Sequence, residues 1–502
     1  MSNDFHMLLH ENTLRYQTLP ESAVVERHAP YTLLTPNRLD ILARYEFARY
    51  YLQGHCLDLG HEIYTNLIQT WHEQTGGFDP GHTCLDDYVR KFCALIDSFR
   101  EYGFDENRSI IPLVQGSIVD GAHRVAAALA LGIEKLPCVT LLGEPQRQDA
   151  ETLRSIGVNP FFVDTFIQRH IELDLRMRAA VFFPCAAEKL HEGLALFASR
   201  NEILHSTDVH VTKRGMQNLV TELYGDLDWW DDYQEKTFAA RRYRRGSPAT
   251  IIFYRQGVED MQSFKDKVRA VLQQGNDSLH TTDDHSEAVA IARVVHNKNS
   301  LDCLNYGRKA HTPVFKEKFA LYKAILKKHP DDESKFALVS GGTLAAYGLR
   351  DVRDIDYIFD KGAPDIEDVE NKINNHNLLY LNIPFREDLL INDPRHFFYK
   401  YGVKFVSADI VKLAKGLRGK LKDTRDVLML KYRRTLLSVF FRQLNTLLLR
   451  IHAVYLYFID FIHFLKNIIK KQFHRGVMLI KRSLPEPVYQ RLRRLYHIVL
   501  FK

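Results

Sequence analysis

The segment 339–360, VSGGTLAAYGLRDVRDIDYIFD, contains residue types that could perform phosphate chemistry. Two aspartates, Asp354 and Asp356, are separated by a single residue near its end. Side chains at positions i and i+2 of a β-strand point to the same face of the sheet. The two carboxylates could therefore chelate one or two hard metal ions such as Mg²⁺. The alternative interpretation is a pair of ordinary surface acids on a short strand.

Two adjacent glycines and a threonine stand eleven residues before these aspartates. Glycine lets the backbone approach a phosphate closely, and a neighbouring hydroxyl can donate a hydrogen bond to it. Nucleotidyl transfer needs a triphosphate that is held still, a metal ion that neutralises charge, and in-line attack. The pattern therefore predicts that Gly341, Gly342 and Thr343 bind a nucleoside triphosphate and that Asp354 and Asp356 hold Mg²⁺.

The same pattern resembles the signature of the DNA polymerase β-type nucleotidyltransferase superfamily, over about residues 315–430. That signature is an apolar residue, a GG or GS pair, a helix, and an acid pair on a strand. A later stretch, KGLRGKLKDTRDVLML, is similar to the R-x-K-x-KD-x-x-D element of small bacterial nucleotidyltransferases. The resemblance implies a nucleotide site that includes a second group of residues: Lys415, Arg418, Lys422, Asp423 and Asp426.

A third carboxylate, which members of that superfamily often carry on a later strand, is missing from the expected position. The predicted strand YGVKFVS contains Lys404 and no acid. Asp409, just beyond it, is the nearby candidate for a further metal ligand. Without a third acid the domain would bind nucleotide but catalyse weakly.

A second group of chemically capable residues lies in the stretch DGAHR, between a predicted strand and a predicted helix. Backbone amides at the start of a helix attract anions, and an arginine adds a forked set of donors. Asp120 could take a proton from a hydroxyl group, and His123 could hold a phosphate. Gly121 and Arg124 would bind the anion. The alternative is an Asp–Gly turn with a capping role and two solvated basic residues.

The wider stretch IIPLVQGSIVDGAHRVAAALALGIEKLPCV resembles the ParB/sulfiredoxin-like fold, over about residues 35–145. That fold includes nucleases, sulfiredoxins and free-serine kinases, all of which handle nucleotides or phosphate. The resemblance implies that Asp120, His123 and Arg124 are the phosphate-handling residues. The helical segments before the turn resemble versions of this module from capsule and O-antigen gene clusters. Nucleic acid is not the expected partner, because an acidic body would repel a duplex.

A third candidate is His280, in the stretch GNDSLHTTDDHSEAVAIARVV. We expect a short turn before a helix, capped by Thr281, Thr282 or Asp283. An imidazole there could carry a phosphoryl group, and the stretch distantly resembles the active-site segment of nucleoside diphosphate kinases. The alternative is a capping turn with structural histidines. RRYRRG, at 241–246, is either an anion-attracting cluster or a solvated face.

Length and composition predict a multidomain α/β protein in a reducing compartment. A chain of 502 residues fits about three domains. The six cysteines are scattered without a CxxC pair, as in cytoplasmic proteins. We expect a helical region with a ParB/sulfiredoxin-like domain at 1–150 and a middle α/β domain at 151–312. A nucleotidyltransferase-like domain would occupy 313–430, followed by a basic amphipathic helical tail at 431–502.

The tail is apolar and strongly basic. From Val427 onward there are 15 Lys and Arg against Asp460 and Glu486, a charge of +13, so residues 1–426 sum to −7. The longest stretch without Lys or Arg is the 15-residue segment 451–465, shorter than the roughly 20 apolar residues of a transmembrane helix. An interfacial helix on anionic lipid is expected, with an oligomerisation helix as the alternative. Its lipid-facing cations would be Arg433, Arg434, Arg442, Arg450, Lys466, Lys470 and Lys471.

Together these features predict a Mg²⁺-dependent phosphate-transfer enzyme, peripheral to the cytoplasmic face of a membrane. The family resemblance, and no physical feature, implies a place in surface-polysaccharide precursor synthesis. The enzyme would transfer a nucleotidyl group to a small hydroxylated substrate: a sugar, a polyol or an amino acid. One alternative is a kinase that acts through the ParB-like module, with a degenerate nucleotidyltransferase domain. Others are a non-catalytic nucleotide-sensing scaffold and a toxin-like nucleotidyltransferase that modifies protein or RNA.

Overall fold

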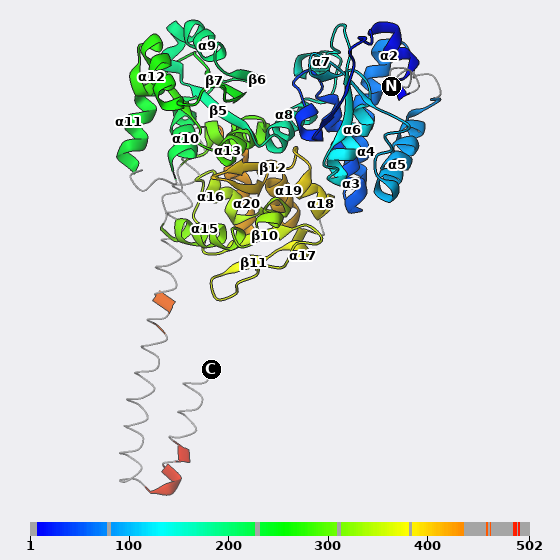
Figure 1. The fold of residues 1–502 in the computed structure, drawn as a ribbon. Coiled ribbons are helices and arrows are strands. Elements are labelled where there is room, and N and C mark those ends of the chain that lie inside the picture. The colour runs from blue at the N-terminus through cyan, green and yellow to red at the C-terminus, as the bar shows by residue number, and fades with distance from the viewer. Residues whose placement is uncertain are drawn as a thin grey trace. The chain divides into compact units, whose positions relative to one another are not determined.

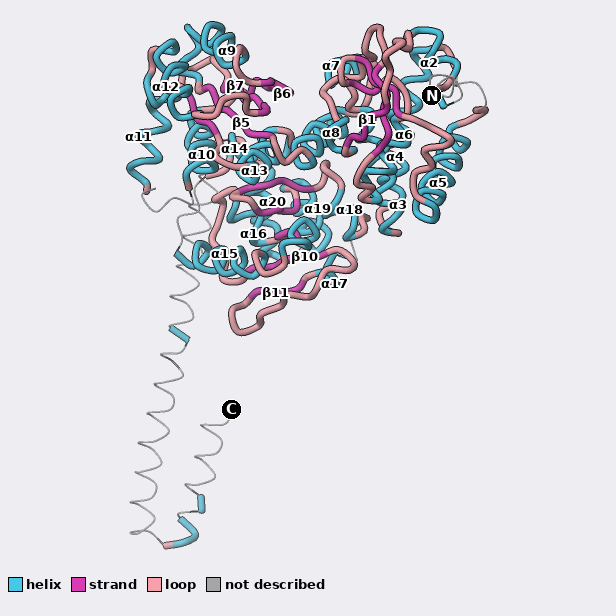
Figure 2. Tube along the Cα trace, viewed as in Figure 1, coloured by secondary structure: helices cyan, strands magenta, loops and turns pink. Residues whose placement is uncertain are grey.

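The computed structural model describes residues 8–77, 82–225, 231–308, 313–380 and 384–435, with a few isolated residues between 458 and 491. Contacts within the chain define two units, Met1–Arg434 and Thr435–Lys502. The first unit contains three separate sheets surrounded by helices (Figures 1 and 2). The predicted mixed α/β class is thereby confirmed.

The N-terminal segment combines helices with a small mixed sheet of order β1-β4-β2-β3. β2 pairs with β4 in parallel and with β3 in an antiparallel hairpin. Over residues 108–142 the order is strand, turn, strand, helix and strand, and Gly132 (φ 70°) ends the helix. The elements are α2 (Glu11–Tyr16), β1 (Val25–His28), η1 (Pro30–Leu33), α3 (Asp40–Gln53), α4 (Leu57–Thr75), α5 (Leu85–Tyr102), β2 (Ile111–Val114), β3 (Ser117–Ile118), α6 (Ala122–Leu131) and β4 (Leu136–Thr140).

The middle segment is built on an antiparallel sheet of order β6-β7-β5-β8. Its central strands are continuous apolar runs because helices cover them, and every residue of β7 except the last is buried. The elements are α7 (Ala150–Ser155), α8 (Pro160–Leu173), β5 (Met177–Phe182), η2 (Pro184–Lys189), α9 (Leu190–Ala198), β6 (Glu202–Val209), α10 (Lys213–Tyr224), α11 (Asp232–Arg242), β7 (Ala249–Arg255), α12 (Met261–Leu272), η3 (Gly275–Asp277), β8 (Leu279–Thr281), α13 (His285–Val295) and α14 (Lys298–Tyr306).

The third segment carries a five-stranded mixed sheet of order β11-β10-β9-β13-β12. β10 is antiparallel to β9 and parallel to β11, so β11 is the strand beside the predicted acid pair. The elements are α15 (Pro313–Leu326), η4 (Pro330–Lys335), β9 (Phe336–Leu338), α16 (Gly341–Ala346), β10 (Ile355–Phe359), β11 (Ile373–Asn375), α17 (Asn377–Tyr380), α18 (Glu387–Asn392), β12 (Phe397–Lys400), β13 (Val403–Val406), α19 (Ala408–Arg418) and α20 (Leu421–Lys431).

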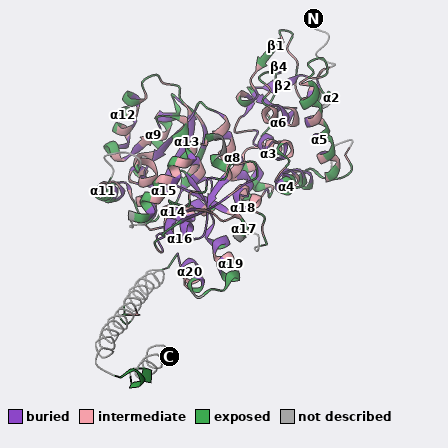
Figure 3. Ribbon diagram, turned by 90° about the horizontal axis from the view of Figure 1, so that it is seen from below, coloured by how far each residue is buried: buried purple, intermediate pink, exposed green. Residues whose placement is uncertain are grey.

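A continuous apolar core joins these segments within the first unit. Buried residues are concentrated on the strands and on the inner faces of the helices (Figure 3). One cluster includes Phe47, Phe253 and Phe397, one from each segment. The three sheets fall in the segments 1–150, 151–312 and 313–430, while the boundaries between those segments stay predictions.

The tail prediction falls almost entirely outside the described residues. Arg433 and Arg434 are described, whereas Arg442, Arg450, Lys466, Lys470 and Lys471 are not. Among the helices that the structure describes, none has the length and apolar character needed to cross a membrane.

Candidate functional site

Asp354 and Asp356 lie at the start of β10. Asp354 precedes the strand and is exposed, whereas Asp356 lies within it and is only 8% exposed. The neighbouring parallel strand β11 places Asn374 in register with Asp356. His376, just after β11, has its Nε2 3.3 Å from Oδ1 of Asp356. The acid pair is therefore flanked by an amide and an imidazole.

The neighbours of Asp356 balance the negative charge of its carboxylate only in part. Burial is the main cause that raises its pKa, and the charge of Asp354 adds to this effect. His376, Asn374 and Lys415 act in the opposite direction. Oδ1 of Asp356 is buried without a hydrogen bond of good geometry. A buried acceptor without a partner is costly, so this oxygen is suited to a cation.

His376 and Asn374 were not predicted from the sequence. Both belong to the polar run INNHN at 373–377, which follows a long loop. A polar run after an apolar strand position was the available signal, but only the parallel pairing of β10 with β11 shows which acid the two side chains face.

Two of the three residues predicted to bind phosphate, Gly341 and Thr343, have a structural role in this fold. Thr343 is fully buried and donates its hydroxyl to the carbonyl of Val406 at 2.9 Å. The prediction that this hydroxyl serves a phosphate is therefore wrong for this structure. A Cβ on Gly341 would lie 2.8 Å from Cγ1 of Val352, so close packing by itself requires glycine there. Phosphate binding by Gly341 and Gly342 stays a prediction.

The second predicted group forms a buried ion-pair network between α19 and α20. Nζ of Lys415 lies 2.7 Å from Asp426 and 3.3 Å from Asp423. Arg418 also pairs with Asp423, at 2.8 Å, and Arg350 pairs with Asp426, at 2.8 Å. Most of these groups thus bind one another. The charge of Lys415 also lowers the pKa of Asp356, but less than the charge of His376 does.

Lys422 and Asp409, the other predicted ligands of this region, differ in their surroundings. Lys422 is exposed on α20. Asp409 lies at the start of α19 and pairs with Lys412 at 2.8 Å and with Arg433 at 3.2 Å. Both oxygens of Asp409 pair with these cations, but 58% of its side chain is exposed, so its role as the third carboxylate stays a prediction. Asn374 and His376 are the groups found beside Asp356.

Lys404 occupies the strand position where a third acid was expected. Its side chain is buried, and Nζ donates to the carbonyl oxygens of Ser334 (2.6 Å) and Ile391 (2.8 Å). Burial lowers the pKa of Lys404 to about 7. The residue therefore fills a packing role under the sheet and is not a substitute for the acid.

The DGAHR turn is closed by its own side chains. Gly121 adopts φ 92°, in the left-handed region, as the N-cap of α6. Asp120 accepts the N–H of Gly121 at 2.6 Å and pairs with Arg124 at 3.1 Å. Arg124 also donates to Ser109 and to the carbonyl of Ile110. Asp120 and Arg124 thus form one partly exposed pair across the turn.

His123 is held as a neutral imidazole. Arg44 donates to its Nε2 at 3.2 Å, and the hydroxyl of Tyr64 lies 2.7 Å from the same atom. Burial and the charge of Arg44 lower the pKa of His123 well below its usual range. It can therefore accept or donate a hydrogen bond, but it does not offer a positive charge to a phosphate. Arg44 is itself anchored by Asp40.

His280 lies in strand β8 and not in the expected turn, and the cap of the following helix is Asp284. Its Nδ1 is 3.2 Å from the hydroxyl of Tyr224. Burial, followed by the charge of Lys265, lowers the pKa of His280 to about 3. The residue lines a cavity of about 990 Å³ together with Glu287 and Lys316.

The RRYRRG cluster is only partly a solvated face. Arg242 is buried against Phe183 and Phe238, where it pairs with Asp277 at 2.8 Å. Arg244 pairs with Glu188 at the surface. The cluster therefore contributes to packing at the end of α11.

Comparisons with protein-family models, with curated proteins and with solved structures found no match to this chain. Of the predicted residues, the structure places Asp354 and Asp356 together at the start of β10, Lys415, Arg418, Asp423 and Asp426 in one ion-pair network, and Asp120 and Arg124 together at the N-terminus of α6.

Proposed function

We propose that the segment 313–430 is a Mg²⁺-dependent nucleotidyltransferase whose metal ligands are Asp354 and Asp356. The observation that carries the proposal is the buried Oδ1 of Asp356, which lacks a hydrogen bond although a second carboxylate stands beside it. In an ordinary surface acid pair water would solvate both carboxylates, whereas Asp356 is buried. Carboxylate oxygens are the ligands that Mg²⁺ prefers, so the residues fit the ion.

When bound, Mg²⁺ would neutralise phosphate charge at this site. His376 would orient the carboxylate of Asp356 through the 3.3 Å contact. His376 and, to a smaller extent, Lys415 oppose the effect of burial, because their positive charges lower the pKa of Asp356. The exposed ammonium group of Lys422 is accessible to an anionic ligand. These side chains would bind and position the metal ion and the nucleotide. Nucleotidyl transfer needs little covalent help from a protein beyond that.

The remaining parts of the proposal come from the family resemblance and from the charge pattern. The acceptor would be a small hydroxylated compound, such as a sugar, a polyol or an amino acid, in surface-polysaccharide precursor synthesis. The enzyme would lie at the cytoplasmic face of a membrane, held by the basic tail at 431–502.

A transfer assay with labelled nucleoside triphosphates, Mg²⁺ and a panel of sugars and polyols tests this function. We expect Asp354→Asn and Asp356→Asn to lower the rate by about a hundredfold or more, because holding the metal contributes several kcal/mol to catalysis. Asp351→Asn, an exposed acid three residues before Asp354, is the matched control and should keep full activity. Transfer that survives both pair variants would contradict the proposal.

A kinase reaction through the N-terminal segment is the second candidate, favoured by the partly exposed Asp120–Arg124 pair. In this reaction Asp120 would accept the proton of a substrate hydroxyl, and Arg124 would bind the phosphate. If Asp120→Asn abolishes phosphorylation while Asp354→Asn leaves every product unchanged, the kinase is the correct assignment. If no variant changes any turnover, but nucleotides with Mg²⁺ still raise the melting temperature, the protein is a nucleotide-binding scaffold.

A further inference from the structure

The end of β10 opposite the acid pair carries a second group of metal-binding residue types. Asp360 follows the strand directly, and the turn between α3 and α4 brings His55 and Cys56 to it. One ligand atom from each of the three residues lies within 4.8 Å of the others. Cys56 is 1% exposed and Asp360 is 2% exposed. The group is therefore an interior cluster and not a chance gathering of surface acids.

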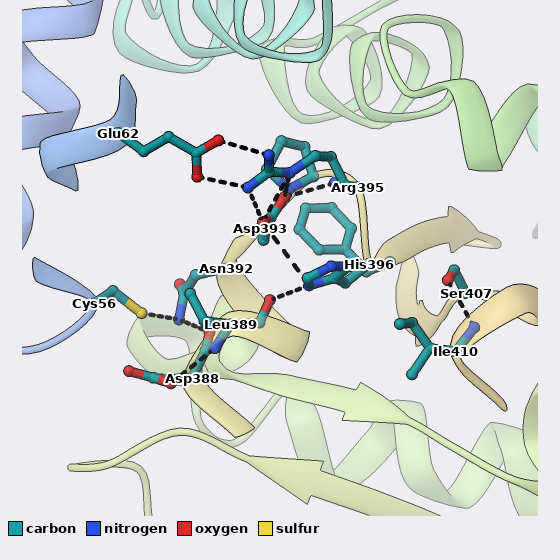
Figure 4. A network of polar contacts seen from close by, with 12 residues as sticks. Cys56, Glu62, Asp388, Leu389, Asn392, Asp393, Arg395, His396, Ser407 and Ile410 are labelled. Carbon is teal, nitrogen blue, oxygen red and sulfur yellow. Dashed lines mark hydrogen bonds and ion pairs between the residues drawn. The ribbon is translucent and has the colours of Figure 1, made fainter. Parts of the chain in front are cut away.

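Three acceptor atoms in this cluster point at a single position. Nδ2 of Asn392 donates to Oδ2 of Asp360 at 2.7 Å, to Sγ of Cys56 at 3.5 Å and to the carbonyl of Asp388 at 2.9 Å. Figure 4 shows Cys56 reaching toward Asn392 from the α3–α4 side. Because one amide group reaches both, Sγ of Cys56 and Oδ2 of Asp360 lie close enough together to share a single partner.

The charges of the cluster are incompletely balanced. Nδ1 of His55 lies 3.6 Å from Oδ2 of Asp360, and it is buried without a hydrogen bond. Within the described part of the chain, His55 is the sole basic group within 4.0 Å of this buried carboxylate. A buried carboxylate normally has a close cation or a full set of donors. The oxygens of Asp360 accept from Asn392 at 2.7 Å and from the N–H of Lys361 at 2.8 Å, so a metal ion between the two groups would supply the partner that Nδ1 of His55 lacks and a positive charge for the carboxylate.

The backbone around the cluster is held in a fixed conformation. Cys56 has φ 53°, in the left-handed region that a side chain rarely adopts. Two ion pairs join the same face to the third segment. Arg386 pairs with Asp58 at 3.0 Å. Arg395 pairs with Glu62 at 2.6 Å, as Figure 4 shows. The ligands are therefore positioned before any ion binds.

We propose that His55, Cys56 and Asp360 form a transition-metal site that binds Zn²⁺. A thiolate, an imidazole and a carboxylate are the ligand types that zinc takes, whereas Mg²⁺ takes oxygen ligands. The residues line a cavity of about 640 Å³, which leaves a fourth coordination position for water or for a ligand. Cys56 binds as the thiolate, so its S–H proton passes to solvent when the ion enters.

The site has a consequence for stability, independent of nucleotidyl transfer. Its ligands come from the α3–α4 turn and from the sheet of the third segment, which are far apart in the sequence. An ion that binds only the folded chain raises its stability and links these segments. Loss of zinc should therefore lower the melting temperature without requiring a change in the Asp354–Asp356 site.

The test uses the full chain, stripped of metal by chelator and dialysed, and then titrated with Co²⁺ and with Zn²⁺. We expect one Co²⁺ per chain, with the charge-transfer absorption of a cobalt–thiolate bond, and displacement by Zn²⁺ but not by Mg²⁺. Cys56→Ser should abolish this absorption, while His55→Asn and Asp360→Asn should weaken Co²⁺ binding by about tenfold or more.

Matched controls separate the site from the other histidines and cysteines of the chain. Cys84→Ser and His61→Asn change exposed residues of the same types outside the cluster, and they should bind Co²⁺ as the unaltered protein does. Circular dichroism checks that each variant is folded. The proposal is overturned if the unaltered protein gives no thiolate absorption with Co²⁺, a result that does not depend on how any variant folds. It is equally overturned if folded Cys56→Ser keeps that absorption.

Discussion

At the scale of single residues, Asp356 combines a proposed functional role with a cost to stability. Burial and the charge of Asp354 raise its pKa, so its folded-state pKa lies above its unfolded value. The folded state then binds more protons, and this group destabilises the protein as pH rises through the window between the two values. We expect Asp356→Asn to raise the unfolding midpoint in urea at neutral pH while it removes Mg²⁺-dependent activity. The prediction fails if Asp356→Asn lowers the urea midpoint while Asp351→Asn leaves it unchanged. That result would mean that neighbouring groups fully balance the buried charge of Asp356.

Lys404 should change the stability of the protein with pH in the opposite direction to Asp356. Its pKa is about 7 in the folded protein, against about 10.4 for an unperturbed lysine. Between these two pKa values the unfolded chain binds more protons than the folded chain. The stability that Lys404 contributes is therefore fully present above about pH 10, and it is lost as pH falls toward 7. The slope is about 1.4 kcal/mol per pH unit within this window.

Lys404→Met should remove that slope, because methionine carries no proton. Urea unfolding of both proteins at several pH values between 7 and 10 measures the difference. Parallel stability curves for the two proteins would mean that Lys404 titrates normally, and that the carbonyls of Ser334 and Ile391 compensate its burial fully.

At the scale of the elements, the turn before α6 depends on one glycine. A Cβ on Gly121 would meet Cδ1 of Ile111 at 2.9 Å and the guanidinium of Arg124 at 3.0 Å, at φ 92°. Gly121→Ala should therefore cost about 1–3 kcal/mol and displace Arg124 from Asp120. Gly132→Ala is the matched control at the other end of α6, since it has a similar φ of 70° but open space around it. It should cost about 1 kcal/mol, and equal losses in chemical denaturation would refute the steric argument.

At the scale of the whole molecule, charge separates the tail from the rest of the chain. The 15 basic residues after position 427 give +13, against −7 for the remainder. Each lysine near an anionic surface contributes about 1 kcal/mol, so changing Lys466, Lys470 and Lys471 to Glu in the full chain should weaken binding to anionic vesicles at least about tenfold. Higher salt should weaken it too. Equal sedimentation of both proteins with these vesicles would favour the oligomerisation helix.

Local pattern predicted the regular elements well. The short apolar runs in IIPLVQ and LPCVTLL form β2 and β4, and the AA-containing run forms α6, which ends before Gly132. His280 is a clear failure, because LHT reads as part of a turn but pairs with β5 as strand β8. A three-residue strand has too little periodicity to be distinguished from a turn. It forms because an existing strand offers it hydrogen-bond partners.

Neighbours along the chain indicate most of the regular elements, the spacing of Asp354 and Asp356 at the start of β10, and the charge difference of the tail. Only the tertiary structure decided which polar groups meet. Register across the sheet puts Asn374 and His376 beside Asp356, helix packing takes Asp409 into ion pairs, and burial takes the hydroxyl of Thr343. The same holds for His55, Cys56 and Asp360. Contacts between distant residues follow from sheet order and core packing, which no local spacing contains.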